Sequence, residues 1–192
     1  GDYLSFLDDD DEYMPDKIEM SLKALEKTKA DCAVSRFYYE HDSMWYESKF
    51  TTDKIRLKNY LLGKIEVGSG SNAVMKRGLF SQVGMWNEDL HRHQDVELLI
   101  RILDKHFIIQ IDKPLFKVYG HTKQDADNML EIKNEFFSII SPYIKKLSFQ
   151  DQKMFYAVQY REVALLYGLE NNTAKMRNFL FKSMRHKMLL PH

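Results

Sequence analysis

Strand-like and helix-like hydrophobic patterns alternate along the first two-thirds of the chain. Short apolar runs rich in strand-forming residues predict strands, and apolar residues spaced three or four apart predict helices. The predicted strands are 3–7, 32–39, 73–76, 107–111 and 115–119, and the predicted helices are 15–29, 52–62 and 94–105. On the first helix we expect Ile18, Leu22 and Leu25 to form the buried face. Alternation of this kind is typical of an α/β layer arrangement.

A purely helical pattern follows. Helical periodicity dominates at 126–146, 151–167 and 173–189, after a polar loop at 120–128. We therefore expect two parts, an α/β domain over residues 1–122 and an all-helical C-terminal extension over residues 123–192.

Four consecutive aspartates, residues 8–11, come directly after the apolar run at 3–7. Such a run predicts a strand buried on both faces, and ligands of open α/β sheets collect just beyond the carboxyl ends of such strands. Adjacent carboxylates raise one another's pKa unless a cation compensates, and their hard oxygens suit Mg²⁺ or Mn²⁺. The alternative is a solvated turn whose last acids cap a helix starting near Pro15.

The composition is that of an ordinary globular protein. The chain has 192 residues, 44% of them hydrophobic, which fits about one domain with or without an appendage. A single cysteine, Cys32, excludes a disulfide framework and a cysteine-based metal site, and it favours a reducing compartment. No apolar stretch approaches the roughly 18 residues of a membrane span, and there is no signal-like segment. Because the sequence starts without Met directly at a strand, we expect further chain upstream.

The zero net charge conceals an acidic front and a basic tail. Residues 1–50 hold 13 acids and 6 bases, whereas residues 145–192 hold 3 acids and 9 bases. The tail helix at 173–189 has an apolar stripe at a spacing of four: Met176, Leu180, Met184 and Met188. Two interpretations stay open, a basic amphipathic helix on an anionic membrane or packing of the stripe on the helix at 151–167, and packing is the usual arrangement.

A second group of acids lies at the start of the predicted helix at 94–105. Glu97 and Arg101 are four apart and can pair along one helix face, whereas Asp95 is left to act as a base. The helix N-terminus is expected to lower the pKa of the Asp95 carboxyl. The alternative is that Asp95 caps the helix.

Several short motifs follow the aspartates in order along the chain. They are Pro15, Gly70-Ser71-Asn72-Ala73, Gly84-Met85-Trp86-Asn87-Glu88-Asp89-Leu90, Gln94-Asp95-Val96-Glu97-Leu98 with Arg101, and Tyr119-Gly120-His121. Together they resemble the family 2 glycosyltransferases of the GT-A fold over about residues 1–122. The resemblance implies a partial GT-A domain, Rossmann-like with a mixed sheet.

The resemblance also implies roles for single residues. Asp8 and Asp10, with Asp11 beside them, would bind a divalent metal, Mg²⁺ or Mn²⁺, and the donor, and His121 could contact metal or diphosphate. Asp95 would be the catalytic base. The family more often has Glu where Gln94 stands, and this departure puts more weight on Asp95.

The acceptor would lie against the turn that holds Trp86, Glu88 and Asp89, where Trp86 is a candidate for stacking on a sugar. Half-buried packing is the alternative for this indole. The implied reaction is inverting transfer of a sugar from a nucleoside-diphosphate sugar to an acceptor hydroxyl, in cell-surface polysaccharide or glycolipid synthesis. We expect a sugar or lipid-linked acceptor, no nucleic acid, and a cytoplasmic location, with peripheral contact to the inner membrane face through 173–189.

The nucleotide-binding half of the family would precede Gly1. We therefore expect the chain by itself to bind sugar nucleotide poorly and to be inactive. Two other functions remain open, a sugar nucleotidyltransferase and a non-catalytic cation-binding module.

Overall fold

The computed structural model describes residues 1–119 and 125–188. The chain divides into two compact units, one formed by Gly1–Tyr60, Lys64–Asp89 and His93–His121, the other by Leu61–Gly63, Leu90–Arg92 and Thr122–His192. The division of the chain into two domains at residues 122 and 123 stays a prediction, and each unit is described by itself.

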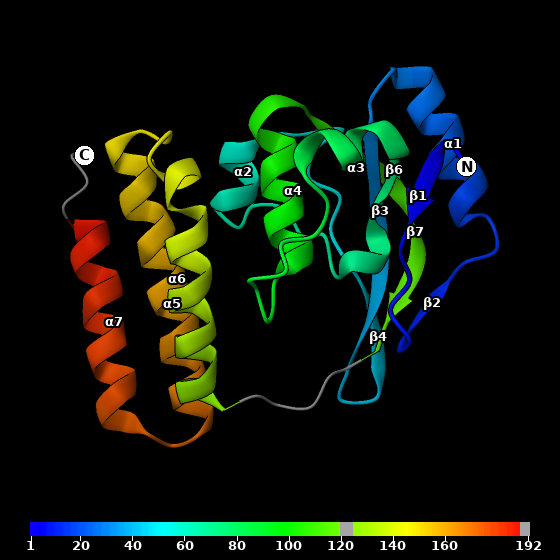
Figure 1. Ribbon diagram of the computed structural model, residues 1–192. Coiled ribbons are helices and arrows are strands. Elements are labelled where there is room, and N and C mark those ends of the chain that lie inside the picture. The colour runs from blue at the N-terminus through cyan, green and yellow to red at the C-terminus, as the bar shows by residue number, and fades with distance from the viewer. Residues whose placement is uncertain (120–124, 189–192) are drawn as a thin grey trace. The chain divides into compact units, whose positions relative to one another are not determined.

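Strands and helices alternate as far as residue 118 (Figure 1). The elements are β1 (Tyr3–Ser5), β2 (Asp11–Tyr13), α1 (Lys17–Thr28), β3 (Cys32–His41), β4 (Met44–Glu47), β5 (Lys54–Ile55), α2 (Leu57–Leu61), the 3₁₀ turn η1 (Gly70–Asn72), β6 (Val74–Lys76), α3 (Arg77–Val83), α4 (Gln94–Lys105) and β7 (Ile108–Val118). Three longer helices follow: α5 (Ala126–Ile144), α6 (Phe149–Leu169) and α7 (Thr173–Met188).

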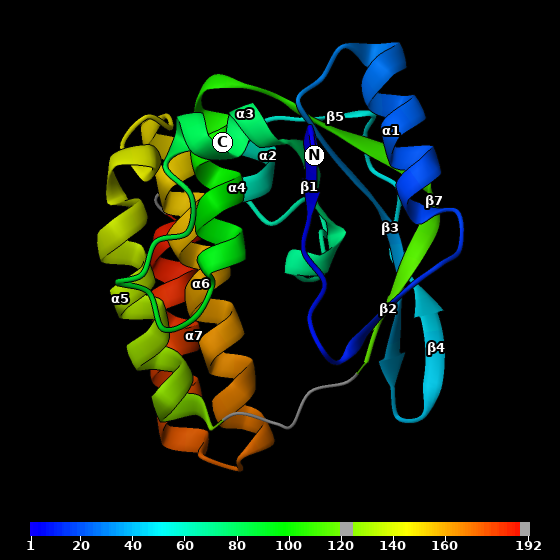
Figure 2. The same cartoon turned by 45° about the vertical axis from the view of Figure 1, so that its right-hand side comes forward.

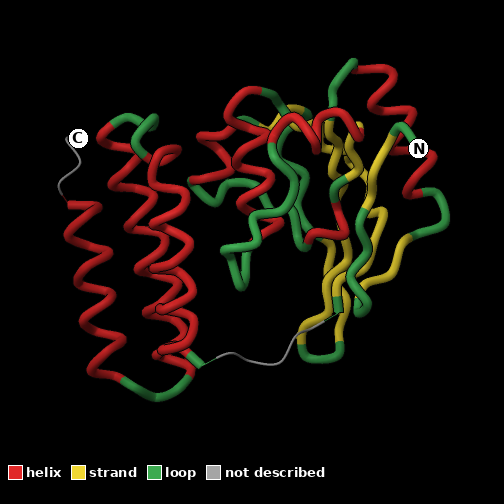
Figure 3. Tube along the Cα trace, in the orientation of Figure 1, coloured by secondary structure: helices red, strands yellow, loops and turns green. Residues whose placement is uncertain are grey.

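The strands form one mixed sheet in the first unit (Figure 3). Its order is β1-β6-β3-β7-β2, with β4 on β3 and β5 on β7. β3 and β7 are parallel, and the other pairs are antiparallel. The predicted mixed sheet, followed by a helical C-terminal part, is therefore confirmed.

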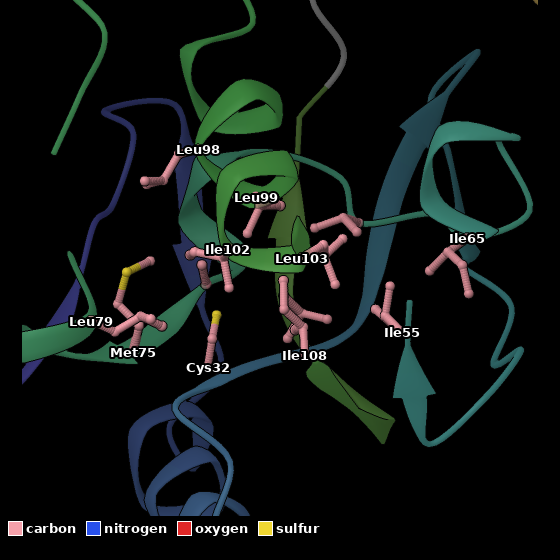
Figure 4. Close-up of a cluster of buried hydrophobic side chains, with 13 residues drawn as sticks. Cys32, Ile55, Ile65, Met75, Leu79, Leu98, Leu99, Ile102, Leu103 and Ile108 are labelled. Atoms are coloured by element: carbon pink, nitrogen blue, oxygen red, sulfur yellow. The ribbon is translucent and has the colours of Figure 1, made fainter. Parts of the chain in front are cut away.

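Alternate residues of the central strands face two different cores. Cys32, Met75 and Ile108 pack with α3 and α4, whereas their neighbours pack with Leu25 of α1. Those neighbours are Ala33, Val74 and Ile109. Figure 2 shows α1 on one side of the sheet and α3 and α4 on the other, and Figure 4 shows the larger core beneath α4. The period of two along each strand thus builds a three-layer unit.

Some predicted elements were wrong in extent. The strand predicted at 3–7 covers only Tyr3–Ser5, and Leu7 is 53% exposed because β1 lies at the end of the sheet and pairs with β6 alone. The prediction of burial on both faces was therefore wrong. In place of a helix at 52–62 the chain forms β5 and the short α2, and sequence patterns predicted none of β2, β4 and α3.

The two strands predicted at 107–111 and 115–119 are one strand, β7. Its pairing with β3 shifts register between Ser35 and Arg36 and again before Tyr38, opposite Pro114. Proline lacks a backbone N–H and is accommodated at such a bulge. The turn signal at 112–114 therefore bends the strand without ending it.

The buried face of α1 differs from the expected one. Lys17, Ser21 and Leu25 are buried, whereas Ile18 is 41% exposed. The prediction for Ile18 was wrong because the first turn of α1 meets a polar region of the sheet, where Lys17 donates hydrogen bonds to neutral oxygens of Asn72 and Ser35.

The second unit is helical, as predicted for 126–146, 151–167 and 173–189. Val163, Ala164 and Tyr167 of α6 pack with Phe179 of α7. Met176 and Leu180 lie against this core, which confirms the packing interpretation for those two residues, whereas Met184 is 51% exposed. Across the residues that the structure describes, we find no helix with the length and apolar character needed to cross a membrane.

Lys17 makes stability depend on pH. Burial lowers the pKa of its ammonium from 10.5 to about 7, so above this pH the folded chain releases a proton that the unfolded chain still holds. The free energy of unfolding of the wild type, compared with that of Lys17→Met, should therefore rise by about 1 kcal/mol per pH unit above neutral pH. Denaturant unfolding at a series of pH values from about 6 to 9 measures this difference. Parallel curves for the two proteins would contradict it.

Candidate functional site

The acidic loop between β1 and β2 brings three carboxylates together. One oxygen from each of Asp8, Asp10 and Asp11 lies within 4.8 Å of the other two. The backbone N–H of Asp11 donates to the carbonyl of Asp8 at 3.2 Å, which closes the loop into a turn. Asp8 and Asp10 are exposed to solvent, whereas Asp11 is half-buried.

Two serines from the segment around η1 hold this loop. The hydroxyl oxygen of Ser71 accepts a hydrogen bond from the backbone N–H of Asp8 at 2.9 Å. The hydroxyl of Ser69 donates to Oδ2 of Asp11. The positions of two acids are therefore set by a segment some 60 residues further along the chain.

The acid cluster suits a divalent cation. Oδ1 of Asp11 is buried and has no hydrogen-bond partner among the described residues. The pKa of Asp8 is raised, first by burial and then by the negative charges of Asp11, Asp95, Asp10 and Asp9. A buried carboxylate oxygen without a hydrogen-bond partner and several neighbouring negative charges both raise the free energy of the folded state. A bound cation lowers both costs. Oxygen donors of this kind fit Mg²⁺ or Mn²⁺.

Asp95 lies in the first turn of α4. The N-cap position of this helix is held by His93 and not by Asp95, although the Asp95 carboxylate accepts hydrogen bonds from backbone N–H groups of the first turn. Burial raises the pKa of the Asp95 carboxyl, and hydrogen bonds from the backbone N–H groups of Val96 and Asp95 only partly offset the rise. We expected the helix N-terminus to lower this pKa, but desolvation outweighs it.

Gly70 lies close to both Asp95 and Asp8. A Cβ atom built on Gly70 would be 3.3 Å from Cβ of Asp95 and 4.0 Å from Oδ2 of Asp8. The negative charge of Asp95 is among the causes of the raised pKa of Asp8. The structure thus brings the two acidic motifs, far apart in sequence, close to the same glycine.

Glu97 and Arg101 form the predicted pair. The guanidinium Nε donates to both carboxylate oxygens of Glu97, at 2.8 and 2.9 Å. Arg101 also donates to the carbonyl oxygens of Val83 and Met85, at the turn after α3. Glu97 is therefore neutralised within the fold, and its partner fixes the segment that leads to Trp86.

Trp86 packs as the alternative interpretation describes. Its indole is half-buried, with ring centroids 4.8 Å from Phe6 and 5.7 Å from Phe80. It also lines a pocket of about 10 Å³ together with Gly70 and Asp95. The indole is thus beside the carboxylate, and its contact with an acceptor stays a prediction.

The remaining predicted site residues are not all close to Asp95. Glu88 and Asp89 are exposed, and the structure does not bring them to Asp95. Gln94 is the first residue of α4 and precedes Asp95. His121 lies outside the described residues, so its role as a metal ligand stays a prediction.

Sequence reasoning missed several residues around the acids. Gly70 and Ser71 were named only as part of a short motif without a role, and Ser69 was not named, although the alternating Gly and Ser of this loop suit close approach of backbone to other groups. Tyr60 was not noticed; the pKa of its phenol is raised by burial and by the charge of Asp95. Only the fold reveals that these residues surround the aspartates.

Comparison with known families shows what the N-terminal part of the chain is similar to. The model of the family described as glycosyl transferase family 2 matches residues 1–84, which include the acidic loop and η1. The N-terminal 84 of the 192 residues are therefore similar to the family 2 glycosyltransferases. This similarity supports a transferase classification and favours glycosyl transfer over nucleotidyl transfer.

Two relatives of this chain are bacterial. It is 26% identical over 137 residues to an uncharacterized glycosyltransferase of Haemophilus influenzae, covering 66% of this chain and 45% of the relative. It is 24% identical over 162 residues to an uncharacterized glycosyltransferase of Rickettsia typhi, covering 80% and 51%. The chain spans about half the length of these curated relatives.

Crystal structures of TarS from S. aureus, residues 1–349, share the fold. One of them matches with a TM-score of 0.52 at 13% identity, over 96% of this chain and 67% of TarS. The complex of TarS with UDP-GlcNAc matches with a TM-score of 0.50 at 10% identity, over 96% and 68%. At such low identity the likeness shows the GT-A fold alone.

Gly70 offers a direct test of the site. In Gly70→Ala the added methyl group would press on Asp95 and approach Asp8, so we expect affinity for Mn²⁺ to fall about tenfold, as for residues that support metal ligands. Isothermal titration calorimetry measures the affinity. The matched control is Gly78→Ala in α3, where a Cβ meets nothing within 4 Å; it should bind Mn²⁺ as the wild type does. Equal affinity in all three proteins would show that Gly70 is not at the metal site.

The raised pKa of Asp8 predicts how metal binding depends on pH. Protons compete with the metal for this carboxylate, and its pKa lies above the ordinary value of 3.8. We therefore expect Mn²⁺ affinity to begin falling, as the pH is lowered, at a higher pH than for an isolated aspartate. Titrations over a pH series measure this, and in Asp8→Asn the dependence should weaken. An affinity that stays constant down to the ordinary aspartate pKa would be inconsistent with a shared site.

Proposed function

We propose that this chain forms the metal-binding and acceptor side of an inverting glycosyltransferase. The enzyme would transfer a sugar from a nucleoside-diphosphate sugar to an acceptor hydroxyl. The observation that carries the proposal is the meeting of Asp8 and Asp95 around Gly70, which puts a metal-type carboxylate and a candidate base at one place.

Asp8, Asp10 and Asp11 would hold the cation. Their oxygens converge, and Oδ1 of Asp11 has no other partner in the described structure. When bound, Mg²⁺ or Mn²⁺ would neutralise negative charge that develops on the leaving diphosphate. Ser69 and Ser71 would keep Asp11 and Asp8 in place for this task.

Asp95 would accept the proton of the attacking hydroxyl. Its raised pKa supports this role, because a carboxylate whose pKa is raised binds a proton more readily. Glu97 is a poor candidate because Arg101 binds both of its oxygens. Trp86 would bound the space in which the acceptor hydroxyl approaches Asp95.

The donor class is supported by the structural relative. TarS has been crystallised with UDP-GlcNAc and with UDP, and we propose a nucleoside-diphosphate sugar for this chain as well. Synthesis of a cell-surface polysaccharide or glycolipid rests on the sequence resemblance.

Membrane contact through α7 rests on charge. Thr173–Met188 contains no acidic residue, and its outer side carries exposed basic side chains: Lys175, Arg177, Lys182 and Arg185. Such a surface suits anionic lipid. A lipid-linked acceptor and a cytoplasmic location at the inner membrane face fit this charge pattern.

The role of Asp95 is tested by Asp95→Asn in the full-length protein. Loss of a general base should lower kcat about 10²- to 10⁴-fold, while Mn²⁺ affinity should change little because the acids of the loop remain. Sugar transfer is followed with radiolabelled UDP-GlcNAc and an acceptor panel, and metal binding by calorimetry.

Asp53→Asn is the matched control, since Asp53 is exposed and outside the site; it should transfer sugar at the wild-type rate. Near wild-type transfer by Asp95→Asn would contradict the proposed base. Metal binding without transfer by the wild-type full-length protein would favour the cation-binding module.

A further inference from the structure

Lys17 is a buried cation in the first turn of α1. Its side chain is 1% exposed. Its Nζ donates to the carbonyl oxygen of Asn72 at 2.5 Å, to Oδ1 of Asn72 at 3.0 Å and to Oγ of Ser35 at 3.3 Å. In the described part of the chain its recorded hydrogen-bond acceptors are neutral oxygens. A buried ammonium without a counter-ion is costly, which indicates that its geometry serves a purpose.

The main partner of Lys17, Asn72, is fully buried and fully engaged. Its Oδ1 also accepts hydrogen bonds from the backbone N–H of Ser35 at 2.8 Å and from Oγ of Ser35 at 3.1 Å. Its Nδ2 donates to the carbonyl oxygens of Ser35 at 2.9 Å and Val67 at 2.6 Å. Asn72 is therefore fixed between α1 and β3, and Lys17 supplies the charged donor.

Asn72 is the last residue of η1, and the three residues before it touch the site. Ser69 donates to Asp11, Ser71 accepts from the backbone of Asp8, and Gly70 lies close to both Asp8 and Asp95. Any shift of Asn72 would be passed through one to three peptide units to all these contacts. The short connection makes Lys17 the anchor behind the acid cluster.

The environment of Lys17 also accounts for its unusual electrostatics. Its Nζ lies 5.1 Å from the ring centroid of Phe116 and 5.7 Å from that of Tyr13, so aromatic faces replace a carboxylate. The titratable groups that face it are the phenol of Tyr13 and the thiol of Cys32. Burial lowers the pKa of Lys17 to about 7.

We propose that Lys17 is a positioning residue of the metal site, which through Asn72 fixes the segment Ser69–Ser71 and hence Asp8 and Asp11. The inference rests on the metal-binding part of the proposed function. It adds a residue that lies outside both acidic motifs and acts on them only through the fold.

The test compares Mn²⁺ affinity in full-length variants by calorimetry. Lys17→Met keeps the length of the side chain and removes every donor, so affinity should fall about tenfold, at the low end of the effect of residues that orient metal ligands. Lys17→Arg, which keeps a charged donor, should recover part of the loss. Hydrogen exchange of the backbone N–H groups of 69–72 should become faster in Lys17→Met and remain slow in the wild type.

Leu25→Ala is the matched control for stability. Leu25 lies on the same face of α1 and is 1% exposed, so its truncation destabilises the fold without touching the network. It should bind Mn²⁺ with wild-type affinity while folded. Equal losses of affinity in Leu25→Ala and Lys17→Met would reduce Lys17 to a structural residue and overturn the proposal.

Ser35→Ala replaces Lys17→Met if that variant does not fold. It removes one hydroxyl shared by Lys17 and Asn72, and a several-fold loss of affinity is expected. Unchanged affinity in the folded variants overturns the role of Lys17 while leaving the metal site intact. Absence of Mn²⁺ binding by the wild type would overturn the metal site itself, and the inference with it.

Discussion

Repulsion between carboxylates is the constraint on which this structure depends. Asp8, Asp10 and Asp11 have oxygens within 4.8 Å of one another, and the charge of Asp95 also acts on Asp8. Such an arrangement opposes folding unless a cation compensates. The fold nevertheless holds it in place with hydrogen bonds from two serines. A cluster maintained against its own electrostatics is typical of a functional site.

The scaffold explains how the cluster is held. The acidic loop joins β1 and β2, the strands at the two ends of the sheet, α4 presents Asp95 in its first turn, and the segment around η1 contacts both. The core beneath α4 fixes the helix, while Arg101 ties it to the turn before Trp86. On the other face of the sheet, α1 brings Lys17 to Asn72. The sheet, α4 on one of its faces and α1 on the other therefore each hold part of the region around Asp8 and Asp95.

Sequence patterns predicted the layers better than the details. Long periodic segments such as α1 and α4 were found because one face of each meets a core, and the Glu97–Arg101 pair followed from helical spacing alone. The short β4 and α3 carry too few residues for a period to emerge. The raised pKa of Asp95 and the contacts of Ser69 and Ser71 were not predictable, because burial and partners some 60 residues away depend on tertiary packing.

The central claim is that the acidic loop and Asp95 share one cation-dependent site. The most direct measurement is anomalous diffraction from crystals of the full-length protein soaked with Mn²⁺. The account predicts an anomalous peak bound by oxygens of Asp8, Asp10 or Asp11, on the side of the loop that faces Gly70 and Asp95. A peak bound elsewhere, or none at these carboxylates in crystals that have taken up Mn²⁺, would contradict it.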